Sequence, residues 1–239
     1  KKKKKRKKKS DSEIPLVSLV GYTNAGKSTL LNTLVDLSLS DESKKVYEED
    51  MLFATLETSI RKIKIKDGKE FLLSDTVGFI RELPHMLIKA FRSTLDEVKN
   101  SDLLLHVVDF SNEEYEENIR VTNSTLKEIG ADNIPVIYVF NKCDKVNDTK
   151  LPYVDENKVY ISAKNNIGIN ELINVISNNI FKEYVTCKME IPFKRGDIVS
   201  YLKEKYDFIS TQYTNDGTLI EICLNKKDYG KYKNYIIEE

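Results

Sequence analysis

A chain of 239 residues, of which 40% are hydrophobic and 32% charged, is long enough for one full α/β domain and a small second unit of a globular protein. Its formal net charge is zero, but residues 1–9 carry nine positive charges, so the remainder is acidic, with a net charge of −9. No apolar stretch approaches the ~20 residues that span a bilayer, and the basic start lacks the apolar segment of a secretory signal.

The basic segment within residues 1–13 allows two interpretations. It could be a phosphate-binding arm, because clustered cations displace counterions from nucleic acid, or a solvated flank, which is typical of runs of like charge. The chain does not begin with Met, and we expect sequence to be missing upstream. Cys143, Cys187 and Cys223 have no metal-ligand spacing, which favours structural thiols in a reduced, cytoplasmic protein.

The first half of the chain alternates between predicted strands and helices. Residues 14–20 form a short apolar run that is followed by Gly21, as expected of a buried parallel strand, and residues 27–37 carry leucines at helical spacing. Residues 61–65 alternate in polarity, and Asp67-Gly68 predicts a hairpin turn into residues 70–73. A helix is predicted across residues 88–100.

The alternation continues through the middle of the chain. The apolar runs 103–108 and 134–140 predict strands. Between these runs, apolar residues recur at helical spacing and predict a helix, and Gly130 predicts where this helix ends. Residues 159–162 and 169–181 predict a last strand and a closing helix. Residues 14–184 are therefore predicted to form one α/β domain with a doubly wound, mostly parallel sheet.

After about Tyr184 the pattern changes to that of a small α+β domain, predicted to span residues 185–239. Its elements are expected as a strand at 189–193, a helix at 197–206, a hairpin of 208–213 with 219–224, and a terminal helix at 226–237. This segment contains nine basic and nine acidic residues, so its charge gives no indication of nucleic-acid binding.

Residues 21–28, GYTNAGKS, match the phosphate-binding pattern G-x-x-x-x-G-K-[ST] between a predicted strand and a predicted helix. The glycines let backbone amides close around phosphate oxygens, Lys27 reaches the β- and γ-phosphates, and Ser28 can ligate Mg²⁺. We expect nucleotide contacts from the whole motif and the residue after it: Gly21, Tyr22, Thr23, Asn24, Ala25, Gly26, Lys27, Ser28 and Thr29.

Residues 141–144, NKCD, follow a predicted strand at the sheet edge where open α/β sheets bind ligands. The Asp144 carboxylate can accept hydrogen bonds from N1 and the exocyclic amine of guanine, whereas adenine offers no such pair of donors. The SAK segment after the last strand suits a loop behind the same base. The residues expected to bind guanine are therefore Asn141, Lys142, Asp144, Ser162, Ala163 and Lys164.

The DTVGF segment, residues 75–79, predicts a loop that senses the γ-phosphate. Asp75 is expected near Mg²⁺ through water, and the Gly78 amide at the phosphate, with Thr76 and Val77 between them. Phe79 stands where many GTP-hydrolysing switches carry a water-orienting glutamine and cannot hydrogen-bond to water. We therefore expect slow intrinsic turnover that a partner raises by ordering the loop, with Lys27, Gly78 and Phe79 as the catalytic candidates.

Several residues leave alternatives open. Thr55 and Thr58, after a polar stretch, are both candidates for a hydroxyl that reaches Mg²⁺ only with GTP bound. His85 could move toward the nucleotide from its loop or be structural. His106 lies in the apolar run LLLHVVD, which favours a core histidine. Asn24 could help to bind a potassium ion, whose charge would complement negative charge developing on the phosphates, or it could simply suit a tight turn.

These motifs, in this order, resemble the translation-factor-related class of P-loop GTPases. The segments VSLVGYTNAGKSTL, LFATLET, DTVGFIRELPH and DLLLHVVDFS resemble the HflX family of ribosome-associated GTPases over most of the chain. Matching FATL onto the family's switch motif favours Thr55 over Thr58 as the Mg²⁺ ligand, beside Ser28 and Asp75. The matched switch segment implies nucleotide contacts from Phe53, Ala54, Thr55, Leu56 and Glu57.

The resemblance implies binding to the large (50S) ribosomal subunit and a role in ribosome splitting, rescue or biogenesis. The family also has an N-terminal domain and a helical linker, whereas here only a lysine-rich stretch precedes the nucleotide-binding domain. The prediction is thus a cytoplasmic, monomeric, Mg²⁺-dependent GTPase that binds GTP and GDP. Phe79 keeps a GTP-binding scaffold with negligible turnover as an alternative, and the NKCD motif argues against a third class, a P-loop ATPase or kinase.

Overall fold

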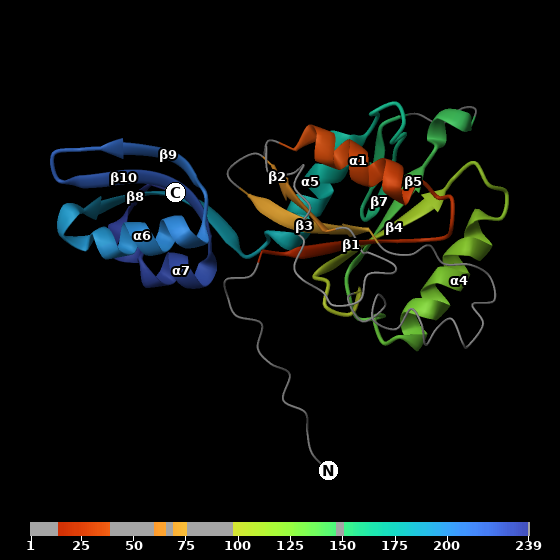
Figure 1. Cartoon of the computed structure of the whole chain (residues 1–239), viewed down its shortest axis with the longest axis horizontal. Coiled ribbons are helices and arrows are strands. Elements are labelled where there is room, and N and C mark those ends of the chain that lie inside the picture. Colours follow the sequence, from red (N-terminus) through yellow and green to blue (C-terminus); the bar gives the residue numbers. More distant parts are fainter. Residues whose placement is uncertain (1–13, 39–59, 66–68, 76–97, 147–150, 239) are drawn as a thin grey trace, which may run out of the picture.

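Figure 1 shows the computed structural model of the chain, which describes residues 14–38, 60–65, 69–75, 98–146 and 151–238. Within these residues the chain forms a seven-stranded sheet followed by a separate four-stranded sheet. The predicted α/β class, a mostly parallel sheet with a small α+β unit after it, is confirmed. No helix in the described ranges is long and apolar enough to cross a membrane.

The seven-stranded sheet has the order β2-β3-β1-β4-β5-β7-β6. Its central strands are parallel, and only the outer pairs β2–β3 and β6–β7 are antiparallel. Its strands are β1 (Leu16–Val20), β2 (Ile60–Lys64), β3 (Glu70–Asp75), β4 (Leu103–Asp109), β5 (Val136–Asn141), β6 (Tyr153–Asp155) and β7 (Lys158–Tyr160). The carboxyl ends of the parallel strands therefore share one edge of the sheet, which is where ligands bind in open α/β folds.

Helices cover both faces of this sheet. Helices α1 (Lys27–Leu37) and α5 (Ile169–Ile180) lie on one face, and α4 (Tyr115–Glu128) lies on the other (Figure 1). A hydrophobic core lies on each face of the sheet, and successive residues of β4 point into different cores. Leu105 packs in the core beneath α1 and α5, whereas Leu104 packs in the core beneath α4. Burial on both faces explains why β4 is a continuous apolar run.

The predicted bounds of the described elements in this part hold to within two residues. The last parallel strand ends at Tyr160 rather than 162, because Ser162 instead forms a bridge with Ile167 in the loop that precedes α5. Strand β6 was not predicted; it pairs antiparallel with β7, and all three of its residues are exposed. Of the helix predicted across 88–100, only residues 98–100 lie in the described part of the chain.

The second sheet is antiparallel, in the order β11-β8-β10-β9. Its strands are β8 (Tyr184–Pro192), β9 (Phe208–Tyr213), β10 (Gly217–Asn225) and β11 (Ile236–Glu238). Helices α6 (Gly196–Lys205) and α7 (Lys226–Lys231) contribute Ile198, Leu202 and Tyr229 to a core with Met189 and Ile222. Tyr184, the last residue assigned above to the first domain, is the first residue of β8.

The predicted terminal helix over 226–237 is wrong beyond Lys231. A short 3₁₀ helix, η5 (Lys233–Tyr235), follows α7, and the chain then pairs with β8 as β11. Ile236 pairs with Met189, so the backbone of this segment forms hydrogen bonds within the second sheet. The Ile236 side chain also packs on the core of that sheet. The apolar spacing that suggested one long helix is thus shared between a helix and a strand on the same core.

Candidate nucleotide site

The phosphate-binding motif forms the turn between β1 and α1, and its glycines are required by geometry. Gly21 has φ 142° and Gly26 has φ 96°, both in the region that favours glycine. A Cβ at Gly21 would lie 2.2 Å from the Val107 carbonyl oxygen, and a Cβ at Gly26 would lie 2.3 Å from Asn141 Nδ2. Neighbouring backbone and side-chain atoms therefore leave no room for a side chain at either position.

Lys27 folds back into the turn that precedes it. Its Nζ donates to the carbonyl oxygens of Gly21, at 3.1 Å, and Tyr22, at 3.0 Å, and the residue is only 7% exposed. Burial lowers the pKa of Lys27, and the opposite charge of Asp75 partly offsets this. The loop thus encloses a cation in the position from which the motif is expected to reach phosphate oxygens.

Ser28 and Asp75 meet beside this loop. The register of β1 and β3 sets Leu19 opposite Asp75, and Ser28 Oγ donates to Asp75 Oδ2 at 2.9 Å. Asp75 Oδ1 is buried without a hydrogen-bond partner within the described residues. Hydroxyl and carboxylate oxygens are the ligands that Mg²⁺ prefers, so this pair fits the predicted magnesium site, directly or through water.

Asn141 connects three loops. Its Nδ2 donates to the Ala25 carbonyl at 3.0 Å, and its Oδ1 accepts a hydrogen bond from the Ala163 amide at 3.0 Å. The residue is 3% exposed, so both hydrogen bonds are shielded from water. One side chain therefore holds the phosphate-binding motif, the NKCD loop and the SAK loop together.

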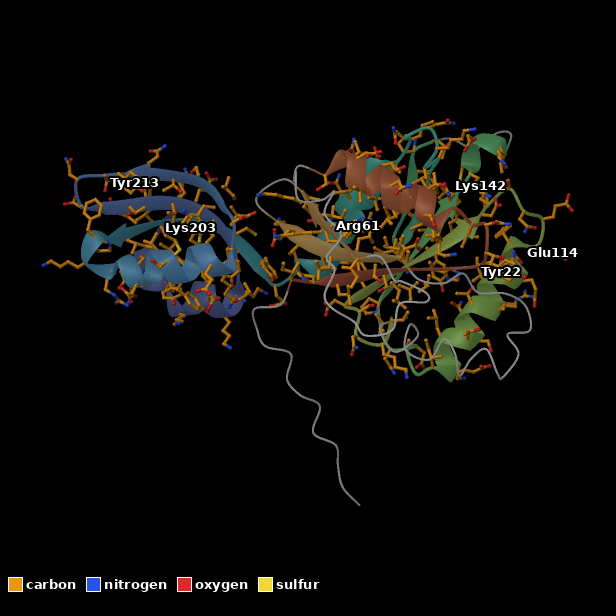
Figure 2. All side chains as sticks on the ribbon, in the orientation of Figure 1. Tyr22, Arg61, Glu114, Lys142, Lys203 and Tyr213 are labelled. Carbon is orange, nitrogen blue, oxygen red and sulfur yellow. The ribbon has the colours of Figure 1, made fainter. Side chains whose placement is uncertain are left out.

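The remaining NKCD and SAK residues surround this connection. Lys142 has φ 64°, and its Nζ donates to the Asn24 carbonyl at 2.7 Å and to Asp109 Oδ2 at 2.7 Å. Asp144 lies in the 3₁₀ helix η3 (Cys143–Lys145) and is exposed. Ser162 and Ala163 are buried, and Lys164 is exposed. Figure 2 shows Tyr22 and Lys142 at the same end of the large sheet.

Asp109 is the residue of this site that the sequence interpretation missed. It ends β4 opposite Asn141 at the end of β5, and it forms an ion pair with Lys142. Burial alone would raise the pKa of Asp109, but the hydrogen bonds from Lys142 and Ser111 outweigh it and hold the pKa below its usual value. The available signal was its position, since a carboxylate directly after a buried parallel strand lies at the ligand-binding edge.

His106 is a core histidine, as predicted. It is 1% exposed, and its ring lies 5.3 Å from that of Tyr138. Burial, with a smaller contribution from the positive charge of Lys27, lowers the pKa of His106 to about 4. The three cysteines are also buried, and burial raises the pKa of the Cys143 thiol to about 11, which agrees with structural thiols.

Asn24 has φ 62°, which asparagine tolerates well, and its carbonyl oxygen accepts the Lys142 hydrogen bond. The tight-turn interpretation thus has a geometric basis, and the potassium site stays a prediction. The other predicted site residues lie outside the described residues: Phe53, Ala54, Thr55, Leu56, Glu57, Thr58, Thr76, Val77, Gly78, Phe79 and His85.

Comparison with known proteins identifies the same segments. The family model described as "50S ribosome-binding GTPase" matches residues 16–142, which include the phosphate-binding motif and the start of NKCD. A protein named GTPase HflX from Caldanaerobacter subterraneus subsp. tengcongensis is 41% identical over 226 residues, covering 95% of this chain and 51% of the relative. GTPase HflX of Escherichia coli K12 is 40% identical over 195 residues, covering 79% and 44%.

The chain thus spans about half the length of the curated relatives it matches. Among solved structures, a GTP-binding protein from the archaeon Sulfolobus solfataricus in complex with GDP aligns with a TM-score of 0.54 and 29% identity. The alignment covers 69% of this chain and 51% of that one. The large sheet and its loops therefore have the architecture of a solved GTP-binding protein.

Proposed function

The chain belongs to the HflX family of GTPases, and we propose that it binds GTP and GDP in the site at the carboxyl edge of β1, β3, β4 and β5 and hydrolyses GTP there in a Mg²⁺-dependent reaction. The observation that carries the proposal is the pair of buried hydrogen bonds through which Asn141 joins the phosphate-binding, NKCD and SAK loops. These loops are expected to contact phosphate and base, so their connection supports a single nucleotide site.

Base recognition is assigned to Asp144, whose carboxylate is exposed at this edge. It would accept hydrogen bonds from N1 and the exocyclic amine of guanine, while the SAK loop, fixed by Asn141, lies behind the base. Adenine lacks that donor pair and would leave the carboxylate without partners, which costs binding free energy. The site should therefore prefer guanine nucleotides strongly.

Magnesium would be held by Ser28 and Asp75, with Thr55 joining them in the GTP state. Bound Mg²⁺ supplies positive charge that stabilises negative charge developing on the phosphate oxygens during hydrolysis. Asp75 Oδ1, which is buried without a partner in the described ranges, supports this assignment because a buried carboxylate oxygen is costly to leave unsatisfied. Lys27 adds a charge-assisted contact to the β- and γ-phosphates.

We further propose that the GTPase associates with the large ribosomal subunit. The support is the description of its family as 50S ribosome-binding and the extent of its similarity to HflX proteins. Phe79 cannot orient a water molecule, so a partner that orders residues 75–79 should accelerate hydrolysis. We also propose that Asn24 helps to bind a potassium ion and that the protein is located in the cytoplasm.

The experiment measures GTP hydrolysis by the purified chain, with and without separated 50S subunits, in Mg²⁺ buffer. We expect slow intrinsic turnover that 50S subunits raise at least tenfold and 30S subunits leave unchanged. Cosedimentation with each subunit under GTP and GDP tests association independently of turnover. GTP binding with no turnover under either condition would favour the scaffold alternative over a GTPase.

A further inference from the structure

Lys142 is held at its ammonium group by two elements that come from different parts of the chain. Its Nζ lies 2.7 Å from the Asn24 carbonyl oxygen in the phosphate-binding loop and 2.7 Å from Asp109 Oδ2 at the end of β4. Its Cε lies 4.0 Å from the position that a Cβ on Gly26 would take. The lysine stem therefore crosses from the end of β5 over the phosphate-binding loop.

The Asp109 carboxylate is held by Ser111 as well as by the lysine. Its Oδ1 accepts hydrogen bonds from the Ser111 amide, at 3.1 Å, and the Ser111 hydroxyl, at 2.6 Å, so only Oδ2 is directed to Lys142. The parallel register of β4 and β5 sets Asp109 opposite Asn141, one residue before the lysine. Both side chains are about one-quarter exposed, at 22% and 26%, so water screens the pair only in part.

We propose that Asp109 is a positioning residue for guanine-nucleotide binding: its carboxylate holds Lys142 across the phosphate-binding loop, so that the lysine stem forms a fixed wall of the site before the nucleotide arrives. A lysine side chain loses rotamer entropy when it is immobilised. Because Asp109 fixes the stem in the protein itself, the bound nucleotide does not have to order it, which favours binding. The inference rests on the proposed function of the same site.

The proposal predicts a specific change in nucleotide release. In Asp109→Asn the amide keeps the shape of the carboxylate and an oxygen for Ser111, but it loses the charge that attracts Lys142. We expect GDP to dissociate about tenfold faster, which corresponds to about 1.4 kcal/mol, with little change in the association rate. The measurement is stopped-flow fluorescence with methylanthraniloyl-GDP displaced by excess GDP, in Mg²⁺ buffer.

Two control variants separate the ion pair from other effects. Glu117→Gln breaks the exposed ion pair of Glu117 with Arg120 on α4, at 3.1 Å, and should leave GDP release unchanged. Ser111→Ala removes one of the two hydrogen bonds that fix Asp109 but leaves the charge that attracts Lys142, so release should accelerate clearly less than in Asp109→Asn. If Ser111→Ala accelerates release as much as Asp109→Asn does, the turn rather than the ion pair controls release, and the proposal is wrong.

A double-mutant cycle with Lys142→Met tests whether Asp109 acts through the lysine. Methionine keeps an unbranched stem without the ammonium group, so adding Asp109→Asn to it should change GDP release less than twofold. An equal acceleration by Asp109→Asn in the wild-type and Lys142→Met backgrounds, or none in the wild-type background, would overturn the proposal. Wild-type protein that fails to bind GDP would instead contradict the proposed function.

Discussion

Asn141 joins the loops of the site through its side chain. Its side chain is buried and forms hydrogen bonds with the backbone of two other loops. Replacement by alanine would leave the Ala25 carbonyl and the Ala163 amide buried without partners, and each unsatisfied group costs about 1–3 kcal/mol. The motif NKCD predicted the residue, but its two backbone partners, at positions 25 and 163, could be seen only in the folded chain.

We therefore predict that Asn141→Ala lowers the free energy of unfolding by about 2–4 kcal/mol and weakens GDP binding. Asn157→Ala is the matched control, because the Asn157 side chain makes a single exposed hydrogen bond to the Val136 carbonyl, at 3.1 Å. Urea unfolding without nucleotide measures the first effect. Equal stability of the two variants would show that Asn141 does not hold the loops together.

His106 gives the protein a pH dependence of known sign. Its folded-state pKa of about 4 lies below the ordinary value of 6.5, so between these values the unfolded chain binds a proton that the folded chain does not. Stability should fall as the pH decreases from about 6.5 towards 4, by about 3 kcal/mol in total. Urea unfolding at several pH values measures this loss.

The variant His106→Gln isolates this contribution, because glutamine is polar but does not titrate. It should remove the part of the pH dependence that belongs to residue 106, leaving the shallower profile of the carboxylates. If the wild type and His106→Gln lose stability in parallel between pH 6.5 and 4, the buried histidine is not responsible. The sequence predicted the burial of His106 from LLLHVVD, and burial is the main cause of its lowered pKa; the smaller contribution of the Lys27 charge could be seen only in the folded chain.

At the scale of elements, helices α6 and α7 are joined through one buried carboxylate. Asp228 in α7 accepts hydrogen bonds from Lys205 Nζ, at 2.7 Å, and from Tyr206 Oη, at 2.6 Å, at the end of α6. The exposed fractions of the Asp228 and Lys205 side chains are 4% and 10%. Loss of the carboxylate would leave a nearly buried ammonium group without its charged partner, which is strongly destabilising.

Asp228→Ala is therefore predicted to lower the free energy of unfolding by about 3 kcal/mol. Asp197→Ala removes a carboxylate from the same unit, but its ion pair with Arg195 is exposed, and stability should not change measurably. Chemical denaturation of both variants provides the test. An Asp228→Ala protein as stable as Asp197→Ala would contradict the assigned role.

Elements with strong local patterns were predictable, and those that depend on pairing were not. The sequence pattern predicted a helix at residues 27–37 and a strand at residues 208–213, and these ranges are the bounds of α1 and β9, respectively. Strand β6 has no comparable signal, since its exposed residues gain their conformation by pairing with β7. The same holds for β11, which becomes a strand because β8 offers it an edge.

At the scale of the whole molecule, the two sheets meet far from the nucleotide loops. Lys64 at the end of β2 forms an ion pair with Asp207, at 2.5 Å, and the Lys226 amide donates to the Glu183 carbonyl, at 2.7 Å. The small sheet thus lies at the opposite end of the large sheet from Lys142 (Figures 1 and 2). None of these contacts could be predicted from sequence, because they join residues without any shared motif.

The motifs located most of the described site, since each one marks the end of a strand and parallel strands share a carboxyl edge. The position of Asp109 at the end of an apolar run was visible in the sequence, but its contact with Lys142 and the connecting role of Asn141 were not, because they depend on the register between β4 and β5 and on where the loops close. Sequence pattern therefore identified the functional groups, and the fold identified what positions them.

The loops that Asn141 joins should form one site selective for guanine nucleotides. Competition of GDP and ADP against methylanthraniloyl-GDP, for wild type and Asp144→Asn, tests it most directly. We expect GDP to compete at least about a hundredfold better than ADP for wild type, and Asp144→Asn to weaken GDP binding while strengthening the binding of xanthosine diphosphate, added as a third competitor. Comparable affinity of the wild-type protein for ADP and GDP, or an unchanged GDP affinity in Asp144→Asn, would contradict it.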